Sequence, residues 1–252
     1  MVNKLTRYRV ILEYDGTDLI GWQENTDGPS VQSLVQDAIF QFCGEKTTVY
    51  SAGRTDAGVH AISMVAHFDL EKEQDAETVM RAMNFYLTNK PVAVLNCKKV
   101  SDDFHSRFSC TKRYYKYIVI NRSAPVVLQK NRVWWVPQKL DVEKMKSAAQ
   151  KLIGKHDFTS FRAAQCQSKS PVKTLDSVSI TQNGPEIIFE FSARSFLHHQ
   201  VRNMVGTLVE IGMGKPLNID EILAAKNRSA AGINAPASGL YFINADYATD
   251  AD

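Results

Sequence analysis

One short segment carries the side chains best suited to chemistry, Gly53-Arg-Thr-Asp-Ala-Gly-Val-His60. Its carboxylate, Asp56, follows a cation, Arg54, by two positions. A carboxylate beside a cation could act as a nucleophile or stabilise a positively charged intermediate. Glycines on both sides would let the backbone turn sharply or let a ligand approach closely. The spacing alone, however, favours an ordinary surface turn with a solvated Arg–Asp pair.

Basic and aromatic residues interleave in a second segment, Lys112-Arg-Tyr-Tyr-Lys-Tyr117, which follows Phe104-His-Ser-Arg-Phe108. A strand turns alternate side chains to opposite faces, so Arg113 and Tyr115 would share one face and Lys112 the other. Bases stack on aromatic rings and phosphates pair with Lys and Arg, which makes this segment a candidate RNA-facing strip. The alternative is an edge strand with half-buried tyrosines and solvated lysines.

The third candidate is a lone arginine, Arg202, in the apolar segment 196–211, which predicts a helix. An arginine buried among apolar residues needs a carboxylate partner. The adjacent histidines His198 and His199 would point to different faces of this helix, so they would not easily hold one ion together.

The cysteines and the composition exclude several classes of protein. The four cysteines (Cys43, Cys97, Cys110, Cys166) are scattered without zinc-ligand spacing, so we expect free thiols in a reducing compartment and no structural metal. No apolar run reaches the ~20 residues of a membrane span, and the N-terminus lacks an apolar signal core. We therefore expect a cytoplasmic protein without a membrane partner.

The elements that must position these residues follow a repeated order. The pattern predicts two tandem βαββαβ units of the ferredoxin-like type, with domains at 1–108 and 109–252. The first domain has 11 Lys and Arg against 15 Asp and Glu, net −4, and the second has 19 against 12, net +7. The positive half is compatible with a polyanionic partner. The expected strands are 7–14, 91–100, 115–121, 172–182, 186–194 and 240–246, with two more beside Asp56, and the expected helices are 30–43, 76–87, 141–154, 196–211 and 220–226.

The segment 53–60 as a whole resembles the signature of the tRNA pseudouridine synthase A family. The resemblance continues through almost the whole chain, from about residue 8 to residue 247, with the motifs in family order. The further matching motifs are Tyr14-Asp-Gly16, Gly21-Trp-Gln23, Ser30-Val-Gln32, Arg113-x-Tyr115-x-Tyr117, His198-His-x-Val-Arg202-Asn203 and Gly239-Leu-Tyr241.

The resemblance implies a function and a role for each candidate residue. The family converts uridines 38, 39 and 40 in the anticodon arm of tRNA to pseudouridine, without a cofactor, as a homodimer that cradles one tRNA. Its α+β fold joins the two halves into a sheet platform with a central cleft. In this chain Asp56 would be the nucleophile, Arg202 its ion-pair partner across the cleft, and Tyr115 and Leu240 the residues against the flipped base. Apart from the resemblance, the residues themselves suggest that Arg54 holds the flipped nucleotide's phosphate or occupies the space it vacates, and that Lys112 and Arg113 bind RNA.

Two departures and two alternatives accompany this interpretation. Family members often have Gln at the position of Met64 and Pro at that of Thr88, so polar contacts just beyond the Asp56 loop are expected to differ. A non-catalytic RNA-binding module would use the same fold class. A hydrolase of glycosidic bonds would need a second carboxylate about 5–10 Å away, and the segment 53–60 supplies only Asp56. Whether attack falls on C1′ or on C6 of the base, the sequence leaves open.

Overall fold

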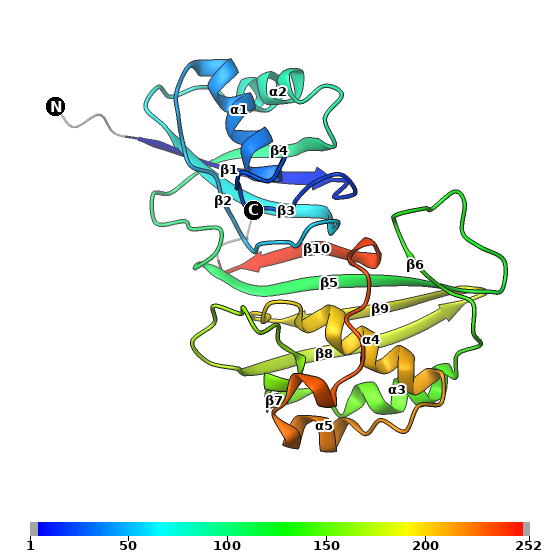
Figure 1. Ribbon diagram of the computed structural model, residues 1–252. Helices are drawn as coiled ribbons and strands as arrows, with labels where there is room; N and C mark the ends of the chain where they lie inside the picture. Colours follow the sequence, from blue (N-terminus) through cyan, green and yellow to red (C-terminus); the bar gives the residue numbers. More distant parts are fainter. Residues whose placement is uncertain (1–4, 249–252) are drawn as a thin grey trace. The chain divides into compact units, whose positions relative to one another are not determined.

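The chain is an α+β protein. A computed structural model describes residues 5–248 (Figure 1). The chain forms two compact units, one made of Met1–Thr111 with Phe242–Asp252 and the other of Lys112–Tyr241. None of the helices within the described range is long and apolar enough to cross a membrane.

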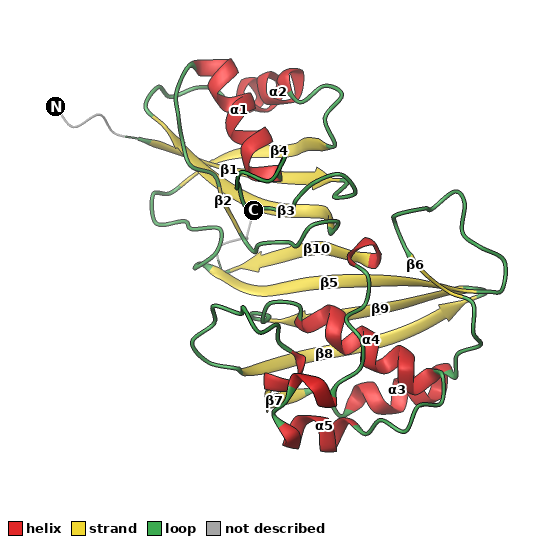
Figure 2. Cartoon of the chain, in the orientation of Figure 1, coloured by secondary structure: helices red, strands yellow, loops and turns green. Residues whose placement is uncertain are grey.

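The first unit has the predicted order of elements. In this unit β1 lies between β3 and β4 and is antiparallel to both, and the short β2 pairs with β3. Helices α1 and α2 cover one face of this sheet (Figure 2). The elements are β1 (Thr6–Tyr14), α1 (Val31–Cys43), β2 (Tyr50–Ser51), β3 (His60–Leu70), α2 (Ala76–Tyr86) and β4 (Val92–Val100).

Strand register explains the core of the first unit. Residues paired across an antiparallel ladder share a face, and Tyr8 is paired with Phe68 and Val10 with Ala66. All four side chains are fully buried or nearly so, and the rings of Tyr8 and Phe68 stack with centroids 5.6 Å apart. The opposite face of β1 and β3 is mixed, because it carries Arg9 and His67 beside the paired Ile11 and Val65.

Local side chains and a glycine define where helices α1 and α2 begin and end. The Ser30 hydroxyl accepts a hydrogen bond from the backbone N–H of Ser33, whose own hydroxyl bonds back to the Ser30 backbone, forming a capping box before α1. Gly44 ends α1 with φ 75°, a left-handed conformation that glycine adopts without steric cost. Asp75 caps α2 by accepting from the N–H of Thr78.

The second unit contains a sheet of order β5-β9-β8-β7, with β6 parallel to β5. The strands β6 and β7 were not predicted, because segments this short carry little periodicity. Helices α3 and α4 pack on each other, and α3 also contacts β8. The elements are β5 (Cys110–Asn121), β6 (Trp134–Val136), α3 (Val142–Gln150), β7 (Gly154–Asp157), β8 (Val172–Asn183), β9 (Glu186–Ala193), α4 (Gln200–Gly212) and α5 (Ile219–Ala225).

The division of the chain differs from the predicted domains in one respect. The last strand, β10 (Leu240–Tyr247), belongs mostly to the first unit. The Tyr247 hydroxyl donates to the Ser106 carbonyl at 2.7 Å, and the Thr111 hydroxyl donates to the Asp246 carbonyl at 3.0 Å. The observed division sharpens the charge asymmetry: the first unit has 11 Lys and Arg against 18 Asp and Glu, net −7, and the second has 19 against 9, net +10.

Candidate functional site

Asp56 lies on the loop between β2 and β3, and the backbone of this loop is fixed by the segment that follows β1. The Trp22 N–H donates to the Thr55 carbonyl at 3.0 Å, and the Gly58 N–H donates to the Leu19 carbonyl at 3.3 Å. Within the loop, the Val59 N–H donates to the Asp56 carbonyl at 3.1 Å. The Asp56 side chain is half-buried. A carboxylate on a loop held this way has a defined position on a rigid scaffold.

Gly21 is required by this packing. It has φ 103°, and a Cβ placed on it would lie 2.5 Å from the Thr55 carbonyl oxygen and 3.0 Å from the Asp56 carbonyl carbon. Gly16 approaches the Val59 backbone even more closely. The neighbouring Trp22 is 3 % exposed, so its ring is part of the core beside the loop. The two glycine motifs between β1 and α1 therefore form the seat of the Asp56 loop.

Two buried side-chain contacts add to this seat. The hydroxyl groups of Tyr14 and Thr55 lie 2.8 Å apart. The His60 ring is 3 % exposed, and its Nδ1 lies 3.0 Å from the Gly16 nitrogen and 3.1 Å from the Asp15 carboxylate. A neutral Nδ1 accepts from Gly16, whereas a protonated one donates to Asp15, so this nitrogen satisfies one of the two at a time. Arg54, on the same loop, is exposed.

The basic and aromatic strip forms the start of β5, and its side chains alternate as the pattern predicts. Arg113 and Tyr115 are buried on one face, and Lys112 is half-exposed on the other. The Tyr115 ring packs edge-on against Phe196, with centroids 5.1 Å apart. The Arg113 guanidinium donates to a backbone carbonyl, that of Arg194, and the Lys112 ammonium lies 3.2 Å from the Asp176 carboxylate.

Arg202 lies in the first turns of α4, half-buried, and is bonded to the segment 233–236. Its Nε donates to the Ala235 carbonyl at 2.8 Å, and the Ala235 N–H donates to the Arg202 carbonyl at 3.2 Å. This segment passes so close to α4 that a Cβ on Gly206 would overlap the Ile233 carbonyl. The same segment then leads to Leu240, which is 6 % exposed at the start of β10.

A buried polar cluster beneath this segment was not predicted. The Asn203 amide donates to the Phe161 carbonyl at 2.8 Å and accepts from Arg228 at 2.9 Å. The Thr207 hydroxyl accepts from the Gly232 N–H at 2.9 Å. Asn203 and Thr207 are one turn apart in a helix that is buried on nearly every side. Two polar residues four positions apart in an apolar segment were the sign in the sequence that could have indicated this cluster.

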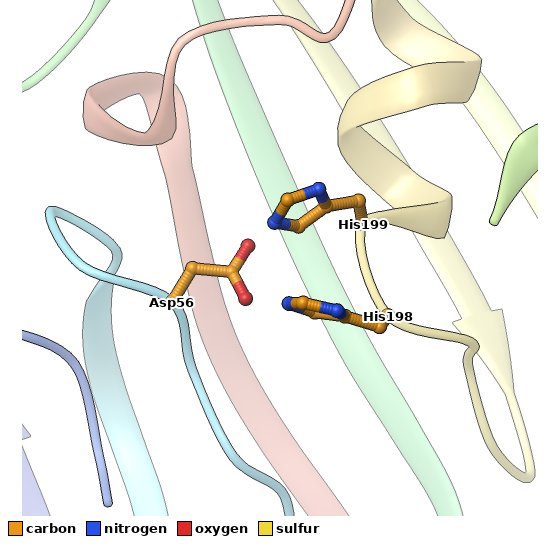
Figure 3. Close-up of side chains that lie close together, drawn as sticks. All are labelled: Asp56, His198 and His199. Carbon is orange, nitrogen blue, oxygen red and sulfur yellow. The ribbon is translucent and has the colours of Figure 1, made fainter. Parts of the chain in front are cut away.

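The expectation about the adjacent histidines was wrong. His198 and His199 precede α4, which begins at Gln200 and not at residue 196. His199 has φ 62°, a left-handed conformation that does not fit within a right-handed helix, so α4 cannot extend back through His199. The two imidazole rings lie side by side with centroids 4.0 Å apart (Figure 3). Asp56 and Arg54 belong to the first unit, and Tyr115, Arg202 and Leu240 belong to the second.

The cysteines agree with the expectation of free thiols. All four are unpaired, and burial raises the pKa of the Cys97 thiol to about 12. The prediction that the protein needs no structural metal rests on the sequence and remains a prediction.

Comparison with known proteins assigns the family. The family model described as tRNA pseudouridine synthase matches residues 10–109 and 148–248. A protein named tRNA pseudouridine synthase A from Rhodospirillum centenum is 54% identical over 245 residues, which cover 96% of this chain and 100% of the relative. Proteins of the same name from Paramagnetospirillum magneticum and Ehrlichia ruminantium are 49% and 50% identical, cover 96% of this chain, and are themselves covered over 96% and 99% of their lengths. The chain therefore belongs to the tRNA pseudouridine synthase family.

Proposed function

We propose that this protein isomerises uridines 38, 39 and 40 of the tRNA anticodon arm to pseudouridine, with Asp56 as the nucleophile. The observation that carries the proposal is the seat of Asp56: backbone hydrogen bonds and two close glycines hold one carboxylate on a loop within a family signature. The proteins named tRNA pseudouridine synthase A at about half identity over nearly the whole chain support the reaction class.

The reaction needs only a few groups. The N1–C1′ bond breaks, the uracil ring turns and C5 bonds to C1′. The hydrogen on C5 leaves as a proton and N1 takes up a proton, so the product is an isomer and no electrons enter or leave. An ionised carboxylate can attack the substrate and then depart unchanged. A guanidinium next to it stabilises the ionised form, and we assign this role to Arg202. No cofactor and no metal enter this scheme.

The base must leave the helical stack before the carboxylate can reach it, and unstacking costs a few kcal/mol. In our proposal Tyr115 and Leu240 hold the flipped base between them, and Tyr115 assists the loss of the C5 proton. The edge-on packing of Tyr115 against Phe196 supports a fixed ring orientation. Arg54 holds the flipped nucleotide from the exposed side of the Asp56 loop.

The surrounding RNA is held by charge. The net charge of +10 on the second unit supports binding of a polyanion. On β5, the half-exposed Lys112 is placed to meet a phosphate, while the buried Arg113 acts through the backbone that it braces. We further propose that the protein works as a homodimer in the cytoplasm, with two subunits around one tRNA.

Mapping the modified positions tests this function. Unmodified tRNA transcripts with uridine at 38, 39 or 40 are incubated with the protein, and pseudouridine is located by a base-specific chemical adduct that stops reverse transcription. We expect pseudouridine at those positions and none elsewhere in the molecule. Modification of other uridines alone would refute the assigned site, and tight tRNA binding without any pseudouridine would favour a non-catalytic RNA-binding module.

A further inference from the structure

Four aromatic rings of the first unit form a continuous group that runs from the core to the surface; we call Tyr50, His67, His105 and Phe108 the aromatic platform. The Tyr50 ring stacks on His67 with centroids 5.2 Å apart and an interplanar angle of 22°. His105 lies 4.5 Å from His67 and 4.4 Å from Phe108. His67 is 1 % exposed, whereas Tyr50 is 49 % and Phe108 is 73 % exposed.

The platform is held rigidly from below. The Ser106 hydroxyl donates to the Tyr50 carbonyl at 2.8 Å and lies 2.8 Å from His67 Nδ1. Within the turn, the Ser109 hydroxyl accepts from the His105 N–H at 3.0 Å, and the Ser109 N–H donates to the His105 carbonyl at 2.9 Å. The backbone on which the exposed rings stand is therefore ordered before any partner arrives, which lowers the entropy lost on binding.

Both histidines favour the neutral, stacking form at neutral pH. Burial, together with the charges of His105 and Arg7, lowers the pKa of His67 to about 4. Burial also lowers the pKa of His105, with Arg7 and Arg107 acting in the same direction. The platform therefore presents π-faces, while its charge comes from the arginines at its edge.

The exposed rings contribute little to folding, because most of the Phe108 surface stays in water. The Arg107 guanidinium lies 5.7 Å from the centre of the Phe108 ring. On the helix-free face of the same sheet, Arg9 is paired with His67 and lies 5.9 Å from the centre of the Phe104 ring. Aromatic faces next to guanidinium groups are the combination that proteins use to stack bases and hold the adjoining phosphates of unpaired RNA.

We propose that the aromatic platform stacks an unpaired nucleotide of the tRNA substrate, with the base on Phe108 and Tyr50 and a neighbouring phosphate on Arg107. The inference rests on the proposed function, because it takes the RNA to be that enzyme's tRNA. It adds an RNA contact on the first unit, whose net charge of −7 gives no sign of one. It also assigns a role to the Phe104–Phe108 motif beside the basic strip of β5.

The test compares the tRNA affinity of the full-length protein and its variants at two or more salt concentrations. We expect Phe108→Ala to weaken binding about 5- to 100-fold. Phe108→Trp should keep the affinity, because it keeps a π-face, and Phe108→Leu should lose it. Phe85→Ala is the matched control, since Phe85 is also 73 % exposed but lies on α2, and it should bind as the wild type does.

The salt dependence separates stacking from charge. Phe108→Ala should leave the slope of log affinity against log salt unchanged, and Arg107→Gln should reduce it by about one. Wild-type tRNA affinity in both Phe108→Ala and Tyr50→Ala would overturn the proposal. A variant that changes the oligomeric state of the protein and leaves its tRNA affinity unchanged would also overturn it. If the wild type binds no tRNA and forms no pseudouridine, both the proposed function and the proposed role of the aromatic platform fail. If the wild type forms pseudouridine and the platform variants bind tRNA as tightly as the wild type does, only the role of the platform fails.

Discussion

Replacing Gly21 by alanine should damage the Asp56 loop directly. The added Cβ would lie 2.5 Å from the Thr55 carbonyl oxygen, and Gly21 has φ 103°. A left-handed conformation costs an L-residue about 1–2 kcal/mol, and forcing a methyl group into a packed site costs about 1–3 kcal/mol more. We therefore expect Gly21→Ala to lower the free energy of unfolding by about 2–5 kcal/mol, with part of the strain relieved by movement of the loop.

The same movement should slow the reaction. A misplacement of about 1 Å in a catalytic group can cost ~100-fold in rate. The assay measures kcat for release of tritium from tRNA labelled at uridine C5, together with urea unfolding of the same samples. Gly44→Ala is the matched control, because Gly44 has φ 75° and a Cβ there would have no neighbour within 4 Å.

The control separates backbone strain from contact. Gly44→Ala should lose about 1–2 kcal/mol of stability and keep its kcat, since it carries the conformational cost alone. If Gly21→Ala kept the wild-type kcat and was no less stable than Gly44→Ala, the idea that Gly21 seats the Asp56 loop would be wrong.

Three further predictions address the same architecture. Tyr14→Phe and Thr55→Val each remove one partner of the buried hydroxyl pair, so each should lower kcat with little change in KM, and the double variant should lose less than the sum of the two. The free energy of unfolding should fall as the pH drops from about 6.5 towards 4, because His67 binds a proton in the unfolded chain at a pH where the folded ring stays neutral. Urea unfolding at several pH values should show that the free energy of unfolding of His67→Gln depends less steeply on pH in this window than that of the wild type. Dialysis against a chelator should leave tritium release unchanged, and loss restored by added zinc would reveal a required metal.

Local signals in the sequence were enough for much of the fold. The range of the first helix, the burial alternation in β5 and the order of elements in the first unit all depend on neighbours in the chain, which periodicity reports directly. His199 shows the limit. Nothing in an apolar run containing His-His indicates a left-handed residue, so the predicted helix began too early.

The parts that were missed depend on contacts between distant segments. Gly21 and Gly206 are needed because other backbone segments pass next to them, and a sequence gives no direct sign of such an approach. Strand β10 joins the first unit through Tyr247 and Asp246, although it follows the second unit in the chain. The Asp56 and Arg202 positions were identified from motifs, and their proposed pairing awaits experiment.

The most direct test of the account is tritium release from C5-labelled tRNA by the wild type and by Asp56→Asn. Forming the C5–C1′ bond expels the C5 hydrogen, so release reports the isomerisation itself. We expect release by the wild type and none by Asp56→Asn, with tRNA affinity retained in both. Release by Asp56→Asn at the wild-type rate would contradict the role of Asp56, and no release by either protein would contradict the reaction.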